Sequence, residues 1–229
     1  MERPAAWTDD RAALHALQRA PLAPVERAGP HEVPRDDVLA RLCDAAADGY
    51  RAAFPDAELV TFTAVDIGFL FDHSTNAERA FRTVAAWTYA HIAPSPRDRS
   101  RQAGFPLPAA LAEAGYKRGH LIAHASGGGL DANVFAQARH VNQGWSPDGR
   151  RYRQLESLAA ANPGSPVFHR LIYGDDTDVP DLNELTVIVD SKAHHGTFDN
   201  RPTAWTSPPA RCDEVDASTT RCRPHSSSA

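Results

Sequence analysis

The chain has few cysteines, and their spacing excludes the common cysteine-based sites. Only Cys43, Cys212 and Cys222 occur in 229 residues, and no two of them form a Cys-x-x-Cys pair. This spacing argues against a zinc ribbon and against a thioredoxin-like redox site. Cys43 falls on the apolar side of an expected helix and is predicted to be a core residue. For Cys212 and Cys222, which flank a polar stretch, a disulfide and two free thiols are equally favoured.

Long apolar runs are also missing. No stretch approaches the roughly 18 apolar residues that a membrane-spanning helix needs. The first twenty residues lack the basic and apolar segments of a secretory signal peptide. We therefore expect no membrane association, and either a cytoplasmic location or export by a non-classical route.

The chain has no overall excess of positive charge, since its net charge is −5. This value is unusual for a protein that handles nucleic acid. The charges are unevenly distributed, however, because residues 97–170 hold ten Lys or Arg and only five Asp or Glu. The segregation is compatible with a basic surface that faces phosphates, although a random partition could also produce it.

Helices and strands are both expected. Helical periodicity predicts helices at residues 9–20, 36–54, 75–91, 108–114 and, with an interruption at 146–149, 141–161. Residue preferences predict strands at 59–71 (one bent strand or two), 117–125, 133–138, 167–173 and 184–189. The pattern predicts an α+β fold with a central, mostly antiparallel sheet flanked by helices and an N-terminal helical extension. We divide the chain into an extension of unknown role at 1–75, a core at 76–202 and a Pro, Ser and Thr-rich tail at 203–229.

The segment from Tyr116 to His124 holds the most informative side chains. On a strand, residues two apart share a face, so Arg118, His120 and His124 are expected to point the same way. Gly119 leaves room there for another group to approach closely. An imidazole can take a proton from water near neutral pH, and a guanidinium can neutralise phosphate oxygens. The pair suits phosphoryl chemistry, but a hydrogen-bonded, half-buried histidine is the commoner role of such a residue.

Amide and carboxylate side chains follow in a fixed order. They are Asn133, Gln137, Asn142 and Glu156, with Asn142 opening the run Asn-Gln-Gly. An asparagine carbonyl is a hard oxygen ligand of the kind that Mg²⁺ accepts, together with several waters. Two strands that lead into a helix carrying Asn142 could hold such an ion opposite His120.

This ordered set resembles the DNA/RNA non-specific endonuclease family of the ββα-metal superfamily. The resemblance covers about residues 76–200 and is strongest over 116–156, where it implies a strand–strand–helix metal finger at 116–161. An upstream helix with Trp87 and Tyr89, followed by an arginine-rich loop, is similar to the family as well. Each piece alone is weak, but the ordered conjunction is fairly specific.

The resemblance implies a role for each matching residue. His120 would be the general base, Asn142 the direct ligand of one Mg²⁺ or Mn²⁺ ion, and Glu156 an acid that touches the ion through water. The remaining assignments are charge neutralisation on the phosphate by Arg118, further phosphate contacts by Arg97, Arg99 and Arg101 (the most favoured of the three), and bracing of the finger by Asn133 and Gln137. Apart from the resemblance, Arg151 with its neighbours Arg150 and Arg153 is a candidate contact for the nucleic-acid backbone, although a solvated helix face would show the same pattern.

The sequence departs from the family pattern at two places. Lys117 stands where the family usually has an aspartate, which puts the local geometry in question. Asn142 and Glu156 are fourteen residues apart, a span of about 21 Å on one continuous helix. The helix must therefore break and fold back for both to share an ion, and a site role and a surface role for Glu156 are equally favoured. His124 is a weaker candidate that more plausibly supports the cleft than reacts.

The resemblance predicts an endonuclease that hydrolyses phosphodiester bonds in DNA, with RNA as a further substrate, and leaves 5′-phosphate products. The leading alternative is a catalytically inactive binding module that keeps the same fold for nucleic acid or for a protein partner. A third hypothesis makes the chain a toxin-like effector, whose producing cell would need an inhibitor or immunity protein. Nothing in residues 1–75 indicates what that part binds.

Overall fold

The computed structural model describes residue 18 and residues 35–64, 66–74, 81–91, 107–128 and 131–203. Its main element is an antiparallel sheet of six strands in the order β1-β2-β3-β6-β7-β8, and β4 and β5 form a separate pair. The six strands are Leu59–Ala64, Ile67–Asp72, Arg82–Tyr89, Pro166–Ile172, Leu182–Val189 and Lys192–Asp199. The predicted α+β class with an antiparallel sheet is confirmed, and the expected strand at 59–71 is two strands.

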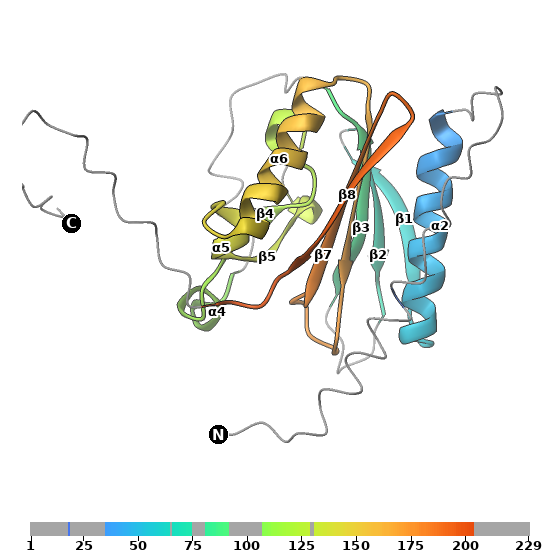
Figure 1. Cartoon of the computed structure of the whole chain (residues 1–229). Coiled ribbons are helices and arrows are strands. Elements are labelled where there is room, and N and C mark those ends of the chain that lie inside the picture. The colour runs from blue at the N-terminus through green and yellow to red at the C-terminus, as the bar shows by residue number, and fades with distance from the viewer. Residues whose placement is uncertain are drawn as a thin grey trace, which may run out of the picture.

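Helices cover both faces of the large sheet (Figure 1). On one face lies α2, Arg35–Ala53, which ends before Pro55 as predicted. Its buried side chains recur every three or four residues, and Cys43 is one of them, a free thiol in the core. The other face carries α6, Pro147–Ala161, together with β4 and β5. No helix in the described ranges is long and apolar enough to cross a membrane.

The expected boundary between residues 75 and 76 falls between β2 and β3. These two strands are paired neighbours in one sheet, with Gly68 opposite Trp87. The ring of Trp87 lies so close to Gly68 that a Cβ there would come within 2.3 Å of it. The two strands before position 75, β1 and β2, therefore belong to the same sheet as β3 and the strands after it.

The predicted helix at 75–91 is wrong, because Arg82–Tyr89 forms β3. This strand is central and covered on both faces, so its apolar residues run almost without alternation and imitate a helical pattern. Its β-branched and aromatic content, Thr83 and Val84 followed by Trp87, Thr88 and Tyr89, favours a strand. Thr75 and Glu78 have the Thr-x-x-Glu spacing that is typical of a helix start, and both lie outside the described residues.

Everything between residues 90 and 165 is inserted between two neighbouring strands of the sheet. Tyr89 of β3 pairs with Pro166 of β6, and Ala90 N donates to Ser165 O at 2.8 Å. Within this insertion lie α4 (Ala109–Glu113), β4 (Tyr116–His120), η1 (His124–Ser126), η2 (Asp131–Asn133), β5 (Val134–Ala138), α5 (Arg139–Asn142) and α6. The sheet thus acts as the base for one strand–strand–helix unit, β4 to α6.

Candidate functional site

The strand β4 presents Arg118 and His120 on one face. Across the ladder, Arg118 pairs with Ala136 and His120 with Val134. Arg118 is half-buried, and His120 keeps 7% of its surface exposed. The strand ends at His120, so the prediction that His124 shares this strand face is wrong. His124 instead begins the single turn η1 after the chain has bent away.

Gly119 is required by the residue that lies over it. A Cβ at this position would come within 2.3 Å of the Gln137 Oε1 atom and 2.5 Å of the Gln137 Cβ. No real side chain tolerates such contacts, because even 3 Å between non-bonded carbon and oxygen atoms is repulsive. The close approach predicted at Gly119 is therefore made by Gln137, whose side chain is buried.

Gln137 and the β4 backbone orient Asn142. The Asn142 Nδ2 atom donates to Gln137 Oε1 at 2.9 Å and faces Arg118 O at 3.4 Å. Since nitrogen and oxygen occupy opposite sides of the amide, Asn142 Oδ1 is directed away from these two acceptors. The side chain is half-buried at the end of α5. A fixed carbonyl oxygen beside Arg118 is the arrangement that a hard cation requires.

The helix breaks directly after Asn142. Gly144 adopts a φ of +71°, a left-handed conformation that glycine accepts without strain. Ser146 then caps α6 by accepting a hydrogen bond from Gly149 N at 2.9 Å, and Pro147 occupies the first turn. The predicted interruption at 146–149 is therefore placed too late in the sequence. The helix is interrupted after Asn142, and residues 146–149 form the start of the second helix. The break that Glu156 needs is present.

Two consecutive residues of α6 hold the backbone on either side of the site. The Tyr152 hydroxyl donates to His120 O at 3.1 Å, and Arg153 donates from Nη2 to Asn142 O at 2.9 Å. Tyr152 is fully buried against Phe198, with ring centroids 5.2 Å apart. The helix therefore fixes the spacing between the ends of β4 and α5. The sequence analysis missed both side chains, although Tyr152 stands one helical turn before Glu156.

Glu156 lies one helical turn after Tyr152, on the same side of α6. Burial raises the pKa of the Tyr152 hydroxyl well above its ordinary value, and the neighbouring Glu156 carboxylate raises it further. The carboxylate is therefore close enough to act on a hydroxyl that is bonded to His120 O. Glu156 is half-buried and is not a fully solvated surface glutamate.

Asn133 braces the chain immediately after His120. Its side chain is fully buried and makes two bonds to one residue, accepting from Ile122 N at 2.8 Å and donating to Ile122 O at 2.9 Å. The backbone carbonyl of Asn133 also accepts a hydrogen bond from Leu121 N at 2.9 Å. Asn133 thus supports the backbone that carries His120, whereas Gln137 supports Asn142.

His169 connects the same segment to the large sheet. Its Nδ1 lies 2.6 Å from Leu121 O, and its Nε2 lies 3.3 Å from the Asn183 side chain. Burial lowers the pKa of His169 to about 4, so the ring is neutral and donates through Nδ1. No sequence signal marked this lone histidine of β6, because its partner is a backbone carbonyl 48 residues away.

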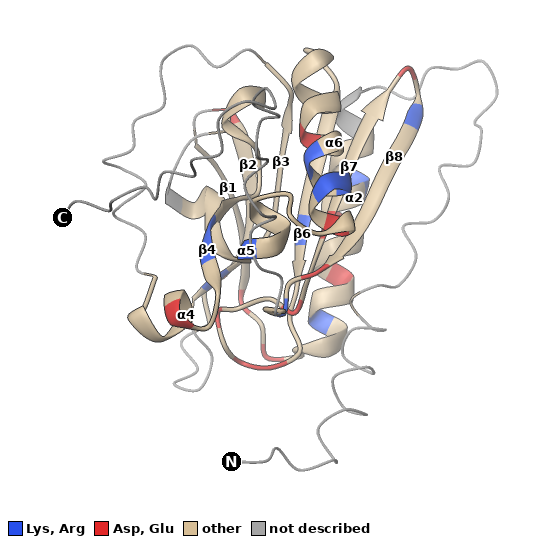
Figure 2. Cartoon of the chain, turned by 60° about the vertical axis from the view of Figure 1, so that its left-hand side comes forward, with Lys and Arg blue, Asp and Glu red and all other residues tan. Residues whose placement is uncertain are grey.

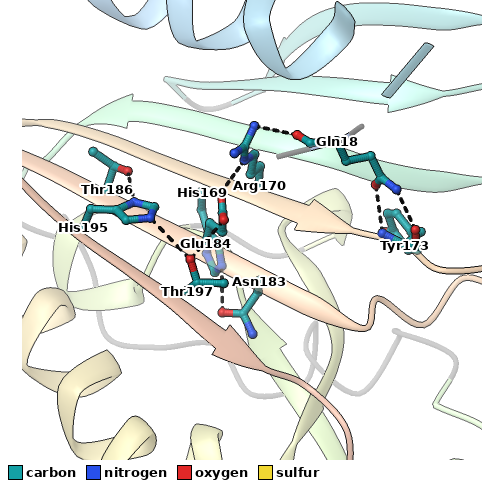
Figure 3. A network of polar contacts seen from close by, with 9 residues as sticks. All are labelled: Gln18, His169, Arg170, Tyr173, Asn183, Glu184, Thr186, His195 and Thr197. Atoms are coloured by element: carbon teal, nitrogen blue, oxygen red, sulfur yellow. Dashed lines mark hydrogen bonds and ion pairs between the residues drawn. The ribbon is translucent and has the colours of Figure 1, made fainter. Parts of the chain in front are cut away.

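A second polar network surrounds Arg170 and Glu184 (Figure 3). Their buried ion pair is extended by Thr197, which donates to Glu184 Oε1, and by Gln18, whose carbonyl accepts from Arg170. Burial opposes ionisation of Glu184, but Arg170 and Thr197 together hold its pKa below the ordinary value. Arg170 is thus committed to the fold and is not part of a phosphate-facing surface. His195, at the margin of the network, is exposed.

Basic residues, blue in Figure 2, lie on β4, α5 and α6 of the strand–strand–helix unit. Besides Arg118, the exposed face of α6 carries Arg150, Arg151 and Arg153. Arg151 donates to His195 O at 2.8 Å and so lies over the edge of β8. The predicted phosphate contacts Arg97, Arg99 and Arg101 lie outside the described residues, as do Cys212 and Cys222.

The donor atoms near Asn142 fit a hard cation better than a zinc ion. No group of three His, Cys, Asp or Glu side chains that could hold a metal occurs in the part of the chain that the structure describes. One amide oxygen and one carboxylate, Asn142 and Glu156, are the oxygen donors that Mg²⁺ accepts while it keeps most of its waters.

No protein-family model matches the chain, and no curated protein matches it significantly. Any function must therefore follow from the chemistry and geometry of these residues.

Proposed function

We propose that the chain is a metal-dependent, non-specific endonuclease of the ββα-metal type, acting on DNA and, as a further substrate, RNA. The observation that carries this proposal is the orientation of Asn142. Its amide nitrogen is bound to Gln137 and faces Arg118 O, while its carbonyl oxygen is directed away. Asn142 ends α5, where a helix leaves carbonyl groups and not N–H groups without partners, so no backbone donor of the helix needs that oxygen and it is available to a cation.

The residues around Asn142 support the same chemistry. His120 and Arg118 share a strand face, and the backbones of His120 and Asn142 are held by consecutive residues of α6. A reacting group needs such rigid support, because errors of a few tenths of an ångström lower the rate.

In the proposed reaction His120 accepts a proton from a water molecule as its oxygen attacks phosphorus in line. Arg118 neutralises charge on the phosphate oxygens. The bond from phosphorus to the 3′ oxygen breaks, that oxygen takes a proton from solvent, and the phosphate remains on the 5′ end.

Asn142 is the residue that would hold the divalent cation directly, with Glu156 contributing through water. When bound, Mg²⁺ or Mn²⁺ supplies positive charge beside the phosphate and the leaving oxygen. Contacts to phosphates rather than to base edges make cleavage largely independent of sequence. Arg150, Arg151 and Arg153 extend the cationic surface along α6 for the flanking backbone.

Cleavage assays with defined substrates test the proposal. Purified protein is incubated with supercoiled plasmid and with total RNA, in Mg²⁺, in Mn²⁺ and in EDTA, and product ends are mapped by phosphatase-dependent labelling. The proposal predicts metal-dependent degradation that leaves 5′-phosphates. A folded sample that cuts neither substrate in either metal would exclude a nuclease.

One observation favours the alternative of an inactive binding module. His120 exposes only 7% of its surface, so little of the imidazole is open to water before substrate binds. If the unit only binds nucleic acid, a labelled oligonucleotide will bind with equal affinity in Mg²⁺ and in EDTA and will remain intact.

A further inference from the structure

The two edge strands of the large sheet differ in how well they are protected. In β1, five of the six residues are exposed, including Val60 at 45% and Phe62 at 39%. Within the part of the chain that the structure describes, no hydrogen bond reaches the outer edge of this strand, whose only ladder is the one to β2. An uncharged, β-prone and open strand edge is a template for pairing with another strand.

The opposite edge, β8, is protected. It carries Lys192, His194 and His195. Arg151 of α6 also donates a hydrogen bond to the backbone carbonyl of His195. Charged side chains and a covering element are the usual means by which sheets block edge pairing. Among the described residues the edge at β8 is protected and the edge at β1 is open, and this difference needs an explanation.

The charges at the ends of β1 indicate what it can pair with. Between residues 52 and 74 there are four acidic residues and no Lys or Arg. Glu58 precedes the strand and Asp66 follows it, and both side chains are exposed. An incoming strand therefore meets negative charge at each end and an apolar, uncharged stretch between.

This charge pattern argues against a nucleic-acid strand and against a second copy of β1 as the binding partner. A nucleic-acid strand would bring phosphates to the acidic ends, where they are repelled. A second copy of β1, paired antiparallel with Phe62 opposite Phe62, would bring each Glu58 level with Asp66 of the other copy. Like charges at both ends of a short pairing oppose it.

We propose that the outer edge of β1 binds an extended segment of a partner protein that is apolar in the middle and basic at both ends. Backbone hydrogen bonds along the edge supply the pairing, and Lys or Arg near Glu58 and Asp66 set the register. Alternate side chains of the partner pack beside Val60 and Phe62. The Phe62 ring is already held in place by Phe69, at 5.1 Å between centroids.

A synthetic peptide tests the proposal independently of any nuclease activity. Glu58 and Asp66 are eight positions apart, so the probe is a nine-residue peptide of alternating Thr and Val with Lys at each end. The control has Glu at each end. Fluorescence anisotropy at low salt should show about tenfold tighter binding of the Lys-ended peptide, from two exposed ion pairs. Hydrogen exchange should slow at residues 59–64.

Two variants of the full chain separate the outcomes. The double variant Glu58→Lys with Asp66→Lys should reverse the preference toward the Glu-ended peptide, which a misfolded protein would not do. Phe62→Lys should abolish binding of both. Equal binding of the two peptides, an unchanged preference in the double variant, or protection outside residues 59–64 would overturn the proposal. Self-association lost in Phe62→Lys would assign the edge to a second copy, and protection by a single-stranded oligonucleotide would assign it to nucleic acid.

Discussion

Polar side chains are buried on both faces of the six-stranded sheet, but the two groups are built differently. Under α2, Arg82 donates from Nε to the Tyr50 hydroxyl at 2.6 Å and from Nη1 to Asp175 O and Thr177 O. The Tyr50 hydroxyl in turn donates to Asp72 at 2.8 Å. Tyr50 and Asp72 are buried, and the two carbonyls belong to the loop after β6, so every partner of Arg82 named here is a group of the fold itself.

On the other face, hydrogen bonds hold the backbone of the site residues. Tyr152 bonds to His120 O, Arg153 to Asn142 O, and Asn133 to both backbone groups of Ile122. The Asn142 carbonyl oxygen is directed away from its amide's partners. In the cluster around Arg82, the charged group is bonded to other groups of the fold and so stabilises it. In the cluster around His120, the bonds from α6 reach backbone carbonyls and leave the side chains of the site residues for chemistry. Mutations should separate the two.

The largest expected effect is on activity and comes from Asn142→Ala. Losing the proposed metal ligand should lower plasmid cleavage by about 10³-fold, since a bound cation contributes several kcal/mol and each 1.36 kcal/mol is tenfold. The melting temperature should fall by only a few degrees, from the loss of the hydrogen bond to the buried Gln137 side chain. The matched control is Gln143→Ala, an exposed neighbour, which should cut normally. Activity within threefold of wild type in Asn142→Ala would remove this residue from the site.

Arg82→Met should mainly lower stability, whereas Asn142→Ala should mainly lower activity. The change keeps apolar contact with the Tyr173 and Phe54 rings, which lie 4.1 and 4.5 Å from the guanidinium, but leaves Asp72 in the interior without its compensating charge. Unfolding free energy should fall by about 3 to 5 kcal/mol, measured by urea denaturation. At temperatures where the variant remains folded, its cleavage rate should match wild type. A loss below 1 kcal/mol would show that the cluster contributes little.

Acid should destabilise the protein through His169, which joins the two layers. Burial holds its pKa at about 4, below the ordinary 6.5, so the unfolded chain binds more protons between these values. The stabilisation is complete above pH 6.5 and is lost as pH falls toward 4, to a total of about 3 kcal/mol. Burial lowers the pKa of His140 as well, in the same direction. In His169→Gln the slope of unfolding free energy against pH should therefore decrease but persist; an unchanged slope would contradict the assignment.

Tyr152→Phe should give the smallest effect. It removes the bond to His120 O and leaves the ring packed on Phe198. Unfolding free energy should drop by about 1 kcal/mol, as for one neutral hydrogen bond. If Tyr152 positions His120, kcat should fall about tenfold with KM unchanged. If the variant has the wild-type kcat at 25 °C, and its activity changes with temperature as that of wild type does, Tyr152 has a structural role only.

The sequence predicted the local parts of this unit well. Gly119 and Gln137 lie in the expected strands, and the long helix ends at residue 161 as expected, because these features depend on short-range patterns. Asn133 instead ends the turn η2 just before β5, and Asn142 ends the short helix α5 and not the long one. The α+β class followed from the same patterns. The helix break was required by the spacing between Asn142 and Glu156, and in the structure it follows Asn142 directly, with α6 beginning at Pro147.

Long-range relations could not be predicted. β3 was mistaken for a helix because a strand covered on both faces loses its alternation. The bond from His169 to Leu121 O and the two bonds from α6 to His120 O and Asn142 O join segments far apart in sequence. Every residue type has a backbone carbonyl, so no sequence motif predicts which carbonyl accepts such a bond.

The most direct test of the account is the rate at which His120→Ala cleaves supercoiled plasmid in Mg²⁺, corrected for the folded fraction from circular dichroism. General-base catalysis contributes 10²- to 10⁴-fold, so the account predicts a loss of about 10³-fold with the fold retained. A folded His120→Ala protein that cuts within tenfold of wild type would contradict it, because the base would then lie elsewhere.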